Sequence, residues 1–113
     1  MLLSVIIPCF NEEKVLENTY SELSSVLRSC ESLNYELIFI DDGSADATPS
    51  VLRKLAAADN RVKVITFSRN FGHQPAVSAG MRYCQGDLAA IIDADLHDPP
   101  QVIPDMKIGR AHV

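Results

Sequence analysis

Residues 88–95, LAAIIDAD, decide how this sequence folds, because a short apolar run ends abruptly in two carboxylates. The same arrangement occurs twice earlier, where residues 3–7 lead to an Asn-Glu-Glu cluster at 11–13 and residues 37–40 lead to a pair of aspartates. Short apolar runs that are followed by turn residues and a helical pattern predict buried parallel strands. The carboxyl ends of parallel strands share one edge of a sheet, where ligands bind in open α/β folds. We therefore expect the acidic residues to gather along one rim.

Helical patterns fill the intervals between these runs. Five residues recur at alternating spacings of four and three and predict one amphipathic helix: Leu16, Tyr20, Leu23, Leu27 and Cys30. Asn11 can cap this helix. A second helix is expected after the turn at 42–46, a third strand at 62–65, and a third helix that Gly86 ends after the polar loop 68–74. Strict alternation of strands and helices predicts a parallel sheet covered by helices, joined by right-handed crossovers. The expected fold class is α/β with three layers.

The bulk composition narrows the class of function. The chain has 113 residues, of which 47% are hydrophobic and 22% charged, so it forms at most one small domain. A net charge of −5 without a basic run argues against nucleic acid as a partner. Three cysteines without CxxC spacing indicate reduced thiols rather than a disulfide or a thiolate metal site. The sequence shows neither an apolar run long enough for a membrane span nor a signal peptide.

The end of the sequence departs from this pattern. Residues 98–101, DPPQ, predict the start of another helix, but the residues after Met106 lack apolar periodicity. The end IGRAHV also resembles one reading frame of a sequencing adaptor. We therefore expect residues 1–106 to be natural sequence that is cut within that helix and residues 107–113 to be a non-native tail, a genuine short tail being the alternative.

The carboxylates of Asp93 and Asp95 can face the same cavity, because they lie two residues apart on a turn that leaves a buried strand. Mg²⁺ and Mn²⁺ take oxygen ligands and are commonly shared between one or two carboxylates and substrate phosphates. His97 is a candidate third ligand, and an imidazole would favour Mn²⁺. Capping of the next helix is the alternative role, but Asp98 alone can fill it. The spacing therefore predicts a divalent cation that neutralises a leaving diphosphate.

The two other acidic clusters, at the ends of the first and second predicted strands, offer groups that suit a nucleoside. Asp41 or Asp42 can accept a hydrogen bond from a base N–H or a ribose hydroxyl, and a helix cap is the alternative. Pro8 lacks an N–H and so closes strand pairing, while Phe10 can lie against a planar base or act as a hydrophobic plug.

Arg69 and His73 are the basic groups best placed to meet a diphosphate, although they can equally be solvated loop residues. The sequence contains neither GxGxxG nor GxxxxGK[ST], which disfavours a Rossmann cofactor site and a P-loop.

Together these residues resemble the family 2 glycosyltransferases with the GT-A fold, a Rossmann-like three-layer α/β/α arrangement with a mostly parallel sheet. The resemblance covers residues 2–106. The family patterns Pro-x-Tyr/Phe-Asn-Glu, Asp-Asp-Gly-Ser and Asp-Ala-Asp-Leu-Gln followed by two prolines match residues 8–12, 41–44 and 93–100, with His97 in the place of glutamine. Residues 69–72 and 79–81 look like the polyprenyl-phosphate branch, which includes bactoprenol glucosyltransferases and dolichol-phosphate mannose synthases.

The resemblance implies a role for each group of residues. The nucleotide would be held by Pro8, Phe10, Asn11, Glu12, Ile40, Asp41, Asp42, Asp93 and Ala94. The Mg²⁺ or Mn²⁺ ion would be held by Asp93, Asp95 and His97, and Arg69 and His73 would contact the diphosphate or the acceptor. Catalytic residues would lie downstream of this chain.

The implied reaction is inverting, metal-dependent transfer of a hexose from a UDP-sugar or GDP-sugar to undecaprenyl or dolichyl phosphate. This chain would hold the donor-binding half and be inactive alone. The full-length protein would be anchored by downstream segments at the cytoplasmic face of the membrane. Two alternatives are a transferase that acts on a polysaccharide acceptor and a non-catalytic, Mg²⁺-binding module of the receiver type.

Overall fold

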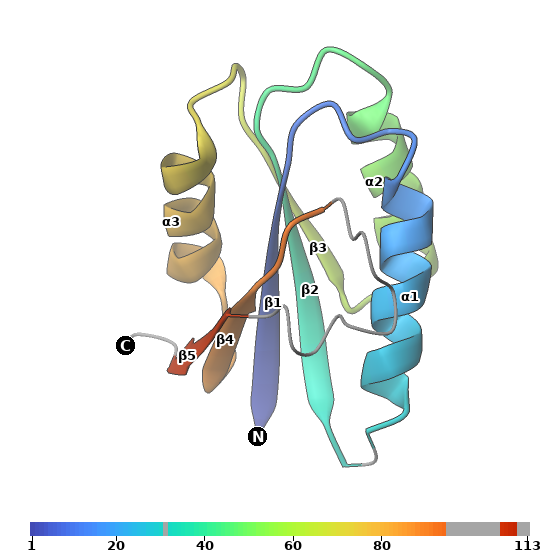
Figure 1. Cartoon of the computed structure of the whole chain (residues 1–113), viewed down its shortest axis with the longest axis vertical. Coiled ribbons are helices and arrows are strands. Elements are labelled where there is room, and N and C mark those ends of the chain that lie inside the picture. Colours follow the sequence, from blue (N-terminus) through green and yellow to red (C-terminus); the bar gives the residue numbers. More distant parts are fainter. Residues whose placement is uncertain (31, 95–106, 111–113) are drawn as a thin grey trace.

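The computed structural model describes residues 1–30, 32–94 and 107–110 as a sheet between two layers of helices (Figure 1). The strands are β1 (Leu2–Cys9), β2 (Asn34–Asp41), β3 (Val62–Thr66), β4 (Leu88–Ile91) and β5 (Lys107–Arg110), and the helices are α1 (Leu16–Arg28), α2 (Thr48–Ala58) and α3 (His73–Tyr83). The strand order is β3-β2-β1-β4-β5. The first four strands pair in parallel, whereas β5 pairs antiparallel with β4.

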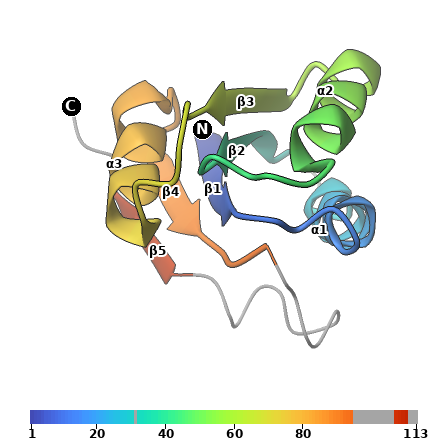
Figure 2. The same cartoon turned by 90° about the horizontal axis from the view of Figure 1, so that it is seen from above.

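The helices cover both faces of the sheet. Figure 2 shows α1 and α2 on one side and α3 on the other. In β1, Val5 and Ile7 are buried in the cluster that faces α1 and α2, while Ile6 is buried in the cluster that faces α3. Burial of both faces explains why the strands appear in the sequence as continuous apolar runs. The predicted three-layer α/β/α fold with a mostly parallel sheet is confirmed.

Three details differ from the sequence-based predictions. The fifth strand was not predicted, and it consists of residues that were expected to lie in the tail. The helix expected after Asp98 falls outside the described residues. Asn11 does not cap α1, which begins five residues later at Leu16 without a side-chain cap. Instead, the Asn11 side chain accepts a hydrogen bond from the Ala45 N–H at 2.8 Å, so a partner 34 residues away replaces the local one.

Pro8 ends strand pairing on one side of β1 only. The Asp42 N–H donates to the Cys9 carbonyl at 2.8 Å, so the polar backbone groups of Cys9 face β2 and those of Pro8 face β4. Pairing with β4 accordingly ends at Ile6 and Ile91, whereas pairing with β2 continues to Cys9 and Asp41. The missing N–H therefore opens the sheet between β1 and β4, at the rim where the acidic residues were expected.

A buried carboxylate joins three segments at the opposite, amino end of the strands. Glu36 on β2 is 6% exposed and accepts hydrogen bonds from the Ser4 hydroxyl at 2.6 Å and the Gln85 N–H at 2.7 Å. The Gly86 N–H donates to the same hydroxyl at 2.8 Å. A Cβ on Gly86 would lie 2.5 Å from that hydroxyl oxygen, so close approach to β1 requires glycine here. The prediction that Gly86 ends α3 as its C′ residue is wrong, since α3 ends at Tyr83 with Cys84 as the cap.

Candidate functional site

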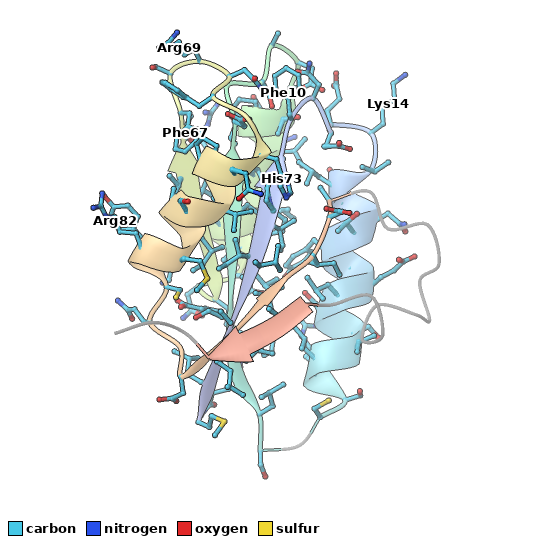
Figure 3. The ribbon with its side chains drawn as sticks, turned by 60° about the vertical axis from the view of Figure 1, so that its left-hand side comes forward. Phe10, Lys14, Phe67, Arg69, His73 and Arg82 are labelled. Atoms are coloured by element: carbon cyan, nitrogen blue, oxygen red, sulfur yellow. The ribbon has the colours of Figure 1, made fainter. Side chains whose placement is uncertain are left out.

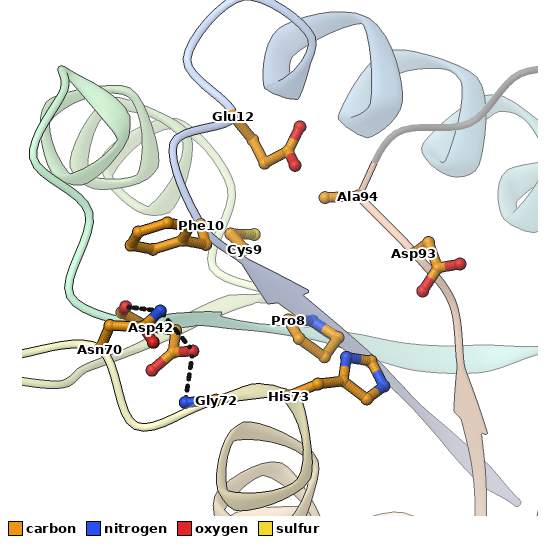
Figure 4. Close-up of a pocket in the computed structure, with 10 residues that line it drawn as sticks. All are labelled: Pro8, Cys9, Phe10, Glu12, Asp42, Asn70, Gly72, His73, Asp93 and Ala94. Atoms are coloured by element: carbon orange, nitrogen blue, oxygen red, sulfur yellow. Dashed lines mark hydrogen bonds between the residues drawn. The ribbon is translucent and has the colours of Figure 1, made fainter.

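The three acidic clusters meet in a cavity of about 300 Å³ at the carboxyl ends of β1, β2 and β4 (Figure 4). Its lining consists of Pro8, Cys9, Phe10, Glu12, Asp42, Asn70, Gly72, His73, Asp93 and Ala94. In Figure 4, Phe10, Asp42 and Asn70 lie toward one end, and His73 and Asp93 lie toward the other. The cavity is of a size that suits a small organic ligand. One end combines the Phe10 ring with the hydrogen-bonded carboxylate of Asp42 and is called the aromatic end, while the other combines Asp93 with His73 and is called the charged end.

The structure brings together seven of the residues that the sequence singled out: Pro8, Phe10, Glu12, Asp42, His73, Asp93 and Ala94. Four others do not line the cavity. Ile40 is fully buried against α3, Asn11 bonds to Ala45, and Asp41 lies beneath the rim. Arg69 points outward at the tip of its loop, whereas His73 lies at the start of α3 (Figure 3).

The Arg69 guanidinium carbon lies 4.5 Å from the centroid of the Phe71 ring, which holds this cation on the outer side of the loop. Asp95 and His97 fall outside the described residues.

The carboxylate of Asp42 is held by one loop. It is 4% exposed and accepts three hydrogen bonds from the loop between β3 and α3: from the Phe71 N–H at 2.7 Å, the Gly72 N–H at 3.0 Å and the Asn70 side-chain amide at 3.1 Å. An ionised carboxylate can accept about four hydrogen bonds. Asp42 therefore fixes the loop and keeps capacity for about one more donor.

Gly43 allows this loop to come so close. Its φ is +72°, and a Cβ built on it would lie 2.1 Å from the carbonyl carbon of Arg69. Both the backbone conformation and the lack of space exclude a side chain here. The sequence Asp42-Gly43 thus combines an acceptor for the loop with the room that the loop needs.

Cys9 and Asp41 lie side by side on the face of the sheet that α1 and α2 cover. Burial raises the pKa of the Cys9 thiol, and the negative charges of Glu12 and Asp41 raise it further. The thiol is therefore neutral at physiological pH and is not a nucleophile, although it lines the cavity. One Asp41 oxygen accepts from the Ser44 N–H at 3.0 Å, while the other is buried without a hydrogen-bond partner among the described residues.

The charged end of the cavity offers groups for an anion and a cation. Asp93 is exposed and follows β4, and α3 begins at His73, so that its first N–H groups lie beside the cavity. Helix N-termini favour anions such as phosphate. The described residues contain no group of three His, Cys, Asp or Glu side chains that could hold a metal ion by themselves. A lone carboxylate still fits Mg²⁺ or Mn²⁺ when phosphate oxygens complete the coordination.

Sequence reasoning missed three residues of the lining: Cys9, Asn70 and Gly72. Cys9 was expected only to be a reduced thiol, and the structure shows it both buried and lining the cavity. The Asn-Phe-Gly sequence at 70–72 carried a usable signal, since glycine and asparagine favour the sharply turned loops that bring N–H groups onto a carboxylate.

The sequence of the chain is similar to known transferases. A family model described as "Glycosyl transferase family 2" matches residues 4–107. An uncharacterised glycosyltransferase, YkcC of Bacillus subtilis, is 50% identical over 103 residues, which are 91% of this chain and 32% of that protein. A prophage bactoprenol glucosyl transferase homolog of Escherichia coli is 41% identical over 106 residues, which are 94% of this chain and 34% of that protein. The chain thus spans about a third of the length of the curated relatives it matches.

Solved structures support the fold. The mannosyltransferase PcManGT of Pyrobaculum calidifontis, in complex with GDP-Man and Mn²⁺, superposes with a TM-score of 0.73 at 24% identity, over 82% of this chain and 27% of that one. At this identity the likeness shows a shared fold, the GT-A fold.

Proposed function

Because the chain belongs to glycosyl transferase family 2, we propose that it binds the nucleotide-sugar donor of an inverting hexose transfer to a polyprenyl phosphate. The observation that carries this proposal is the two-ended cavity of about 300 Å³ at the carboxyl ends of β1, β2 and β4. Membership of this family sets aside the non-catalytic receiver-type module.

The aromatic end of the cavity suits a nucleoside. Phe10 is 45% exposed and offers a ring face against which a base can stack. Asp42, with capacity for about one more hydrogen bond, can accept from a base N–H or a ribose hydroxyl. Both uridine and guanosine carry such an N–H, so UDP-sugars and GDP-sugars both fit.

The charged end suits the diphosphate. Asp93 would hold a Mg²⁺ or Mn²⁺ ion together with phosphate oxygens, and Asp95 and His97 remain predicted ligands. When bound, the ion would neutralise the charge that develops on the departing nucleoside diphosphate. The N-terminus of α3 and His73 would face the same phosphates.

A phosphate acceptor is consistent with the residues of the cavity. The reaction forms a bond between an acceptor oxygen and the anomeric carbon and breaks the bond from that carbon to the diphosphate. A phosphate monoester is already ionised at neutral pH, so it needs little help from a general base. Cys9 is the nearest thiol and stays protonated, which agrees with a single displacement without a covalent enzyme intermediate. The Escherichia coli relative is named as a bactoprenol glucosyl transferase homolog, which is why a polyprenyl phosphate is preferred over a polysaccharide acceptor.

Calorimetric titration of the 113-residue chain with UDP and GDP, each with and without Mn²⁺, tests the donor site. We expect binding that is at least ten-fold tighter with Mn²⁺. Asp93→Asn should abolish the gain from Mn²⁺, because an amide oxygen replaces a charged ligand. Asp87→Asn is the matched control, since Asp87 precedes the same strand at the far end and bonds to the Leu2 N–H.

Metal-independent binding, or an equal loss in both variants, would contradict the role of Asp93 as a metal ligand, and binding of neither nucleotide would contradict the donor site. The acceptor is tested in the longest chain that the gene encodes, by measuring transfer of labelled hexose to undecaprenyl phosphate. Transfer to a polysaccharide instead would keep the donor site and replace the acceptor.

A further inference from the structure

A buried hydroxyl on α1 holds the acidic segment that follows β4. The Thr19 hydroxyl donates a hydrogen bond to the carbonyl of Ala94, 75 residues later in the sequence. Thr19 is 1% exposed and Ala94 is 3% exposed, so water cannot replace this bond. A buried carbonyl without a donor is costly, which makes the contact a strong constraint on the backbone at Ala94.

The Thr19 hydroxyl does not bond to a carbonyl of its own helix. A threonine within a helix commonly bonds to the carbonyl three or four residues before it. The Val15 carbonyl, four residues before, accepts the backbone N–H of Thr19 at 2.9 Å, while the Thr19 hydroxyl reaches across to Ala94. The side chain therefore joins a helix to the exit of a strand.

Two anchors flank Asp93 as a result. On one side, the Ile92 N–H donates to the Ile6 carbonyl at 3.0 Å, and on the other the Ala94 carbonyl accepts from Thr19. The side chains of Ile92 and Ala94 both enter the core that faces α1 and α2. Because side chains alternate along an extended segment, Asp93 is directed away from that core, as Figure 4 shows.

We propose that Thr19 is a positioning residue of the donor site, which acts through the Ala94 carbonyl to set the place of the Asp93 carboxylate. The inference rests on the proposed function, because that function gives Asp93 its role as a metal ligand. Ala94 directly follows Asp93, and the backbone has only two soft dihedral angles per residue, so a constraint on the Ala94 carbonyl also limits the movement of Asp93.

The test compares Thr19→Val, which keeps the shape and loses the hydroxyl, with Thr19→Ser, which keeps the hydroxyl. Nucleotide affinity is measured with and without Mn²⁺, and amide hydrogen exchange of residues 92–94 is measured without any ligand. We expect Thr19→Val to weaken Mn²⁺-dependent binding of UDP or GDP about ten-fold, to change metal-free binding less than three-fold, and to speed exchange at Ile92, whose N–H bonds to the Ile6 carbonyl. In Thr19→Ser, the Mn²⁺-dependent affinity and the amide exchange rate should both lie within three-fold of their values in the original chain.

Ile38→Val is the control for a general loss of stability. Ile38 is buried on the face of the sheet that α3 covers, and its replacement by valine removes one methylene group. Equal effects of Ile38→Val and Thr19→Val on the Mn²⁺-dependent affinity would overturn the inference, as would unchanged exchange at Ile92. If Thr19→Val does not fold, Thr19→Ala takes its place.

The two proposals fail in different ways. An original chain that binds neither nucleotide overturns the proposed function, and the exchange measurement still decides whether Thr19 anchors the segment.

Discussion

Replacement of Gly43 by alanine should remove a large part of the stability of this chain. Gly43 has a φ of +72°, a conformation that costs an L-residue with a Cβ about 1–2 kcal/mol. The new Cβ would also lie 2.1 Å from the carbonyl carbon and 2.6 Å from the carbonyl oxygen of Arg69. These atoms are backbone, so relief requires a shift of the loop, for which overpacking costs of about 1–3 kcal/mol are typical. The sum is a loss of about 2–5 kcal/mol.

The effect can be measured by urea unfolding followed by circular dichroism. With a slope of about 1–1.5 kcal/mol per molar urea for a chain of this size, the midpoint should fall by about 1.3–5 M. Total stabilities of about 5–15 kcal/mol are usual, so part of the variant population is expected to be unfolded even without urea. Nucleotide affinity should fall together with the stability of the variant, because the displaced loop supplies the three N–H donors to Asp42.

Gly43→Asn separates the two contributions. Asparagine tolerates positive φ better than alanine does, but it carries the same Cβ. If the collision dominates, Gly43→Asn should be nearly as unstable as Gly43→Ala. Recovery of the original midpoint by asparagine, or a loss below about 1 kcal/mol in the alanine variant, would refute the argument from close approach.

Three further changes test other parts of the structure. Phe10→Ala should weaken nucleotide binding about ten-fold, since stacking of a base on an aromatic ring is worth about 1–3 kcal/mol, and an unchanged titration would exclude stacking. Tyr20→Phe should cost about 1 kcal/mol at pH 7, because the Tyr20 hydroxyl donates to Asp59 at 2.7 Å. Burial opposes ionisation of Asp59, but the hydrogen bonds from Tyr20 and Arg61 outweigh it and lower its pKa. The difference in unfolding free energy between the original chain and Tyr20→Phe should therefore be complete above about pH 4 and disappear as the pH falls through that lowered pKa. A difference that stays constant from pH 7 to pH 2 would disprove the role of this hydrogen bond. Deletion of residues 107–113 should leave nucleotide affinity unchanged, and sequencing of the native locus across codon 107 decides whether this tail is native.

The strands and helices were predictable because both faces of the central strands are buried. This burial yields uninterrupted apolar runs, and the turn residues between them leave few alternative topologies. The fifth strand gave no such signal. Its sequence KIGR has no apolar alternation, and its partner is β4, whose position emerges only once the sheet has formed. Strand pairing between distant segments can override weak local preference.

The rim of the site was predictable from topology, while its hydrogen bonds were not. Parallel strands place Phe10, Asp42 and Asp93 at one edge whatever the details of the loops. The donors to Asp42 lie 28–30 residues later in the sequence, so no local spacing announces them. Asn11 illustrates the same limit, because a residue suited to cap the next helix instead accepts a hydrogen bond from Ala45, in the loop after β2.

The buried Glu36 has a consequence for the site at the far end of the sheet. Together with Ser4 it holds the turn that leads into β4, and so determines that Leu88 stands beside Leu3. A strand rises about 3.3 Å per residue and alternates its sides, so one inserted residue in the turn would bring Ile92 to the place of Asp93. Insertions at residues 84–87 should therefore abolish Mn²⁺-dependent nucleotide binding in a folded chain, although no pocket residue changes. The position of Asp93 at the rim is thus set by the length of the turn at residues 84–87, at the opposite end of the strands.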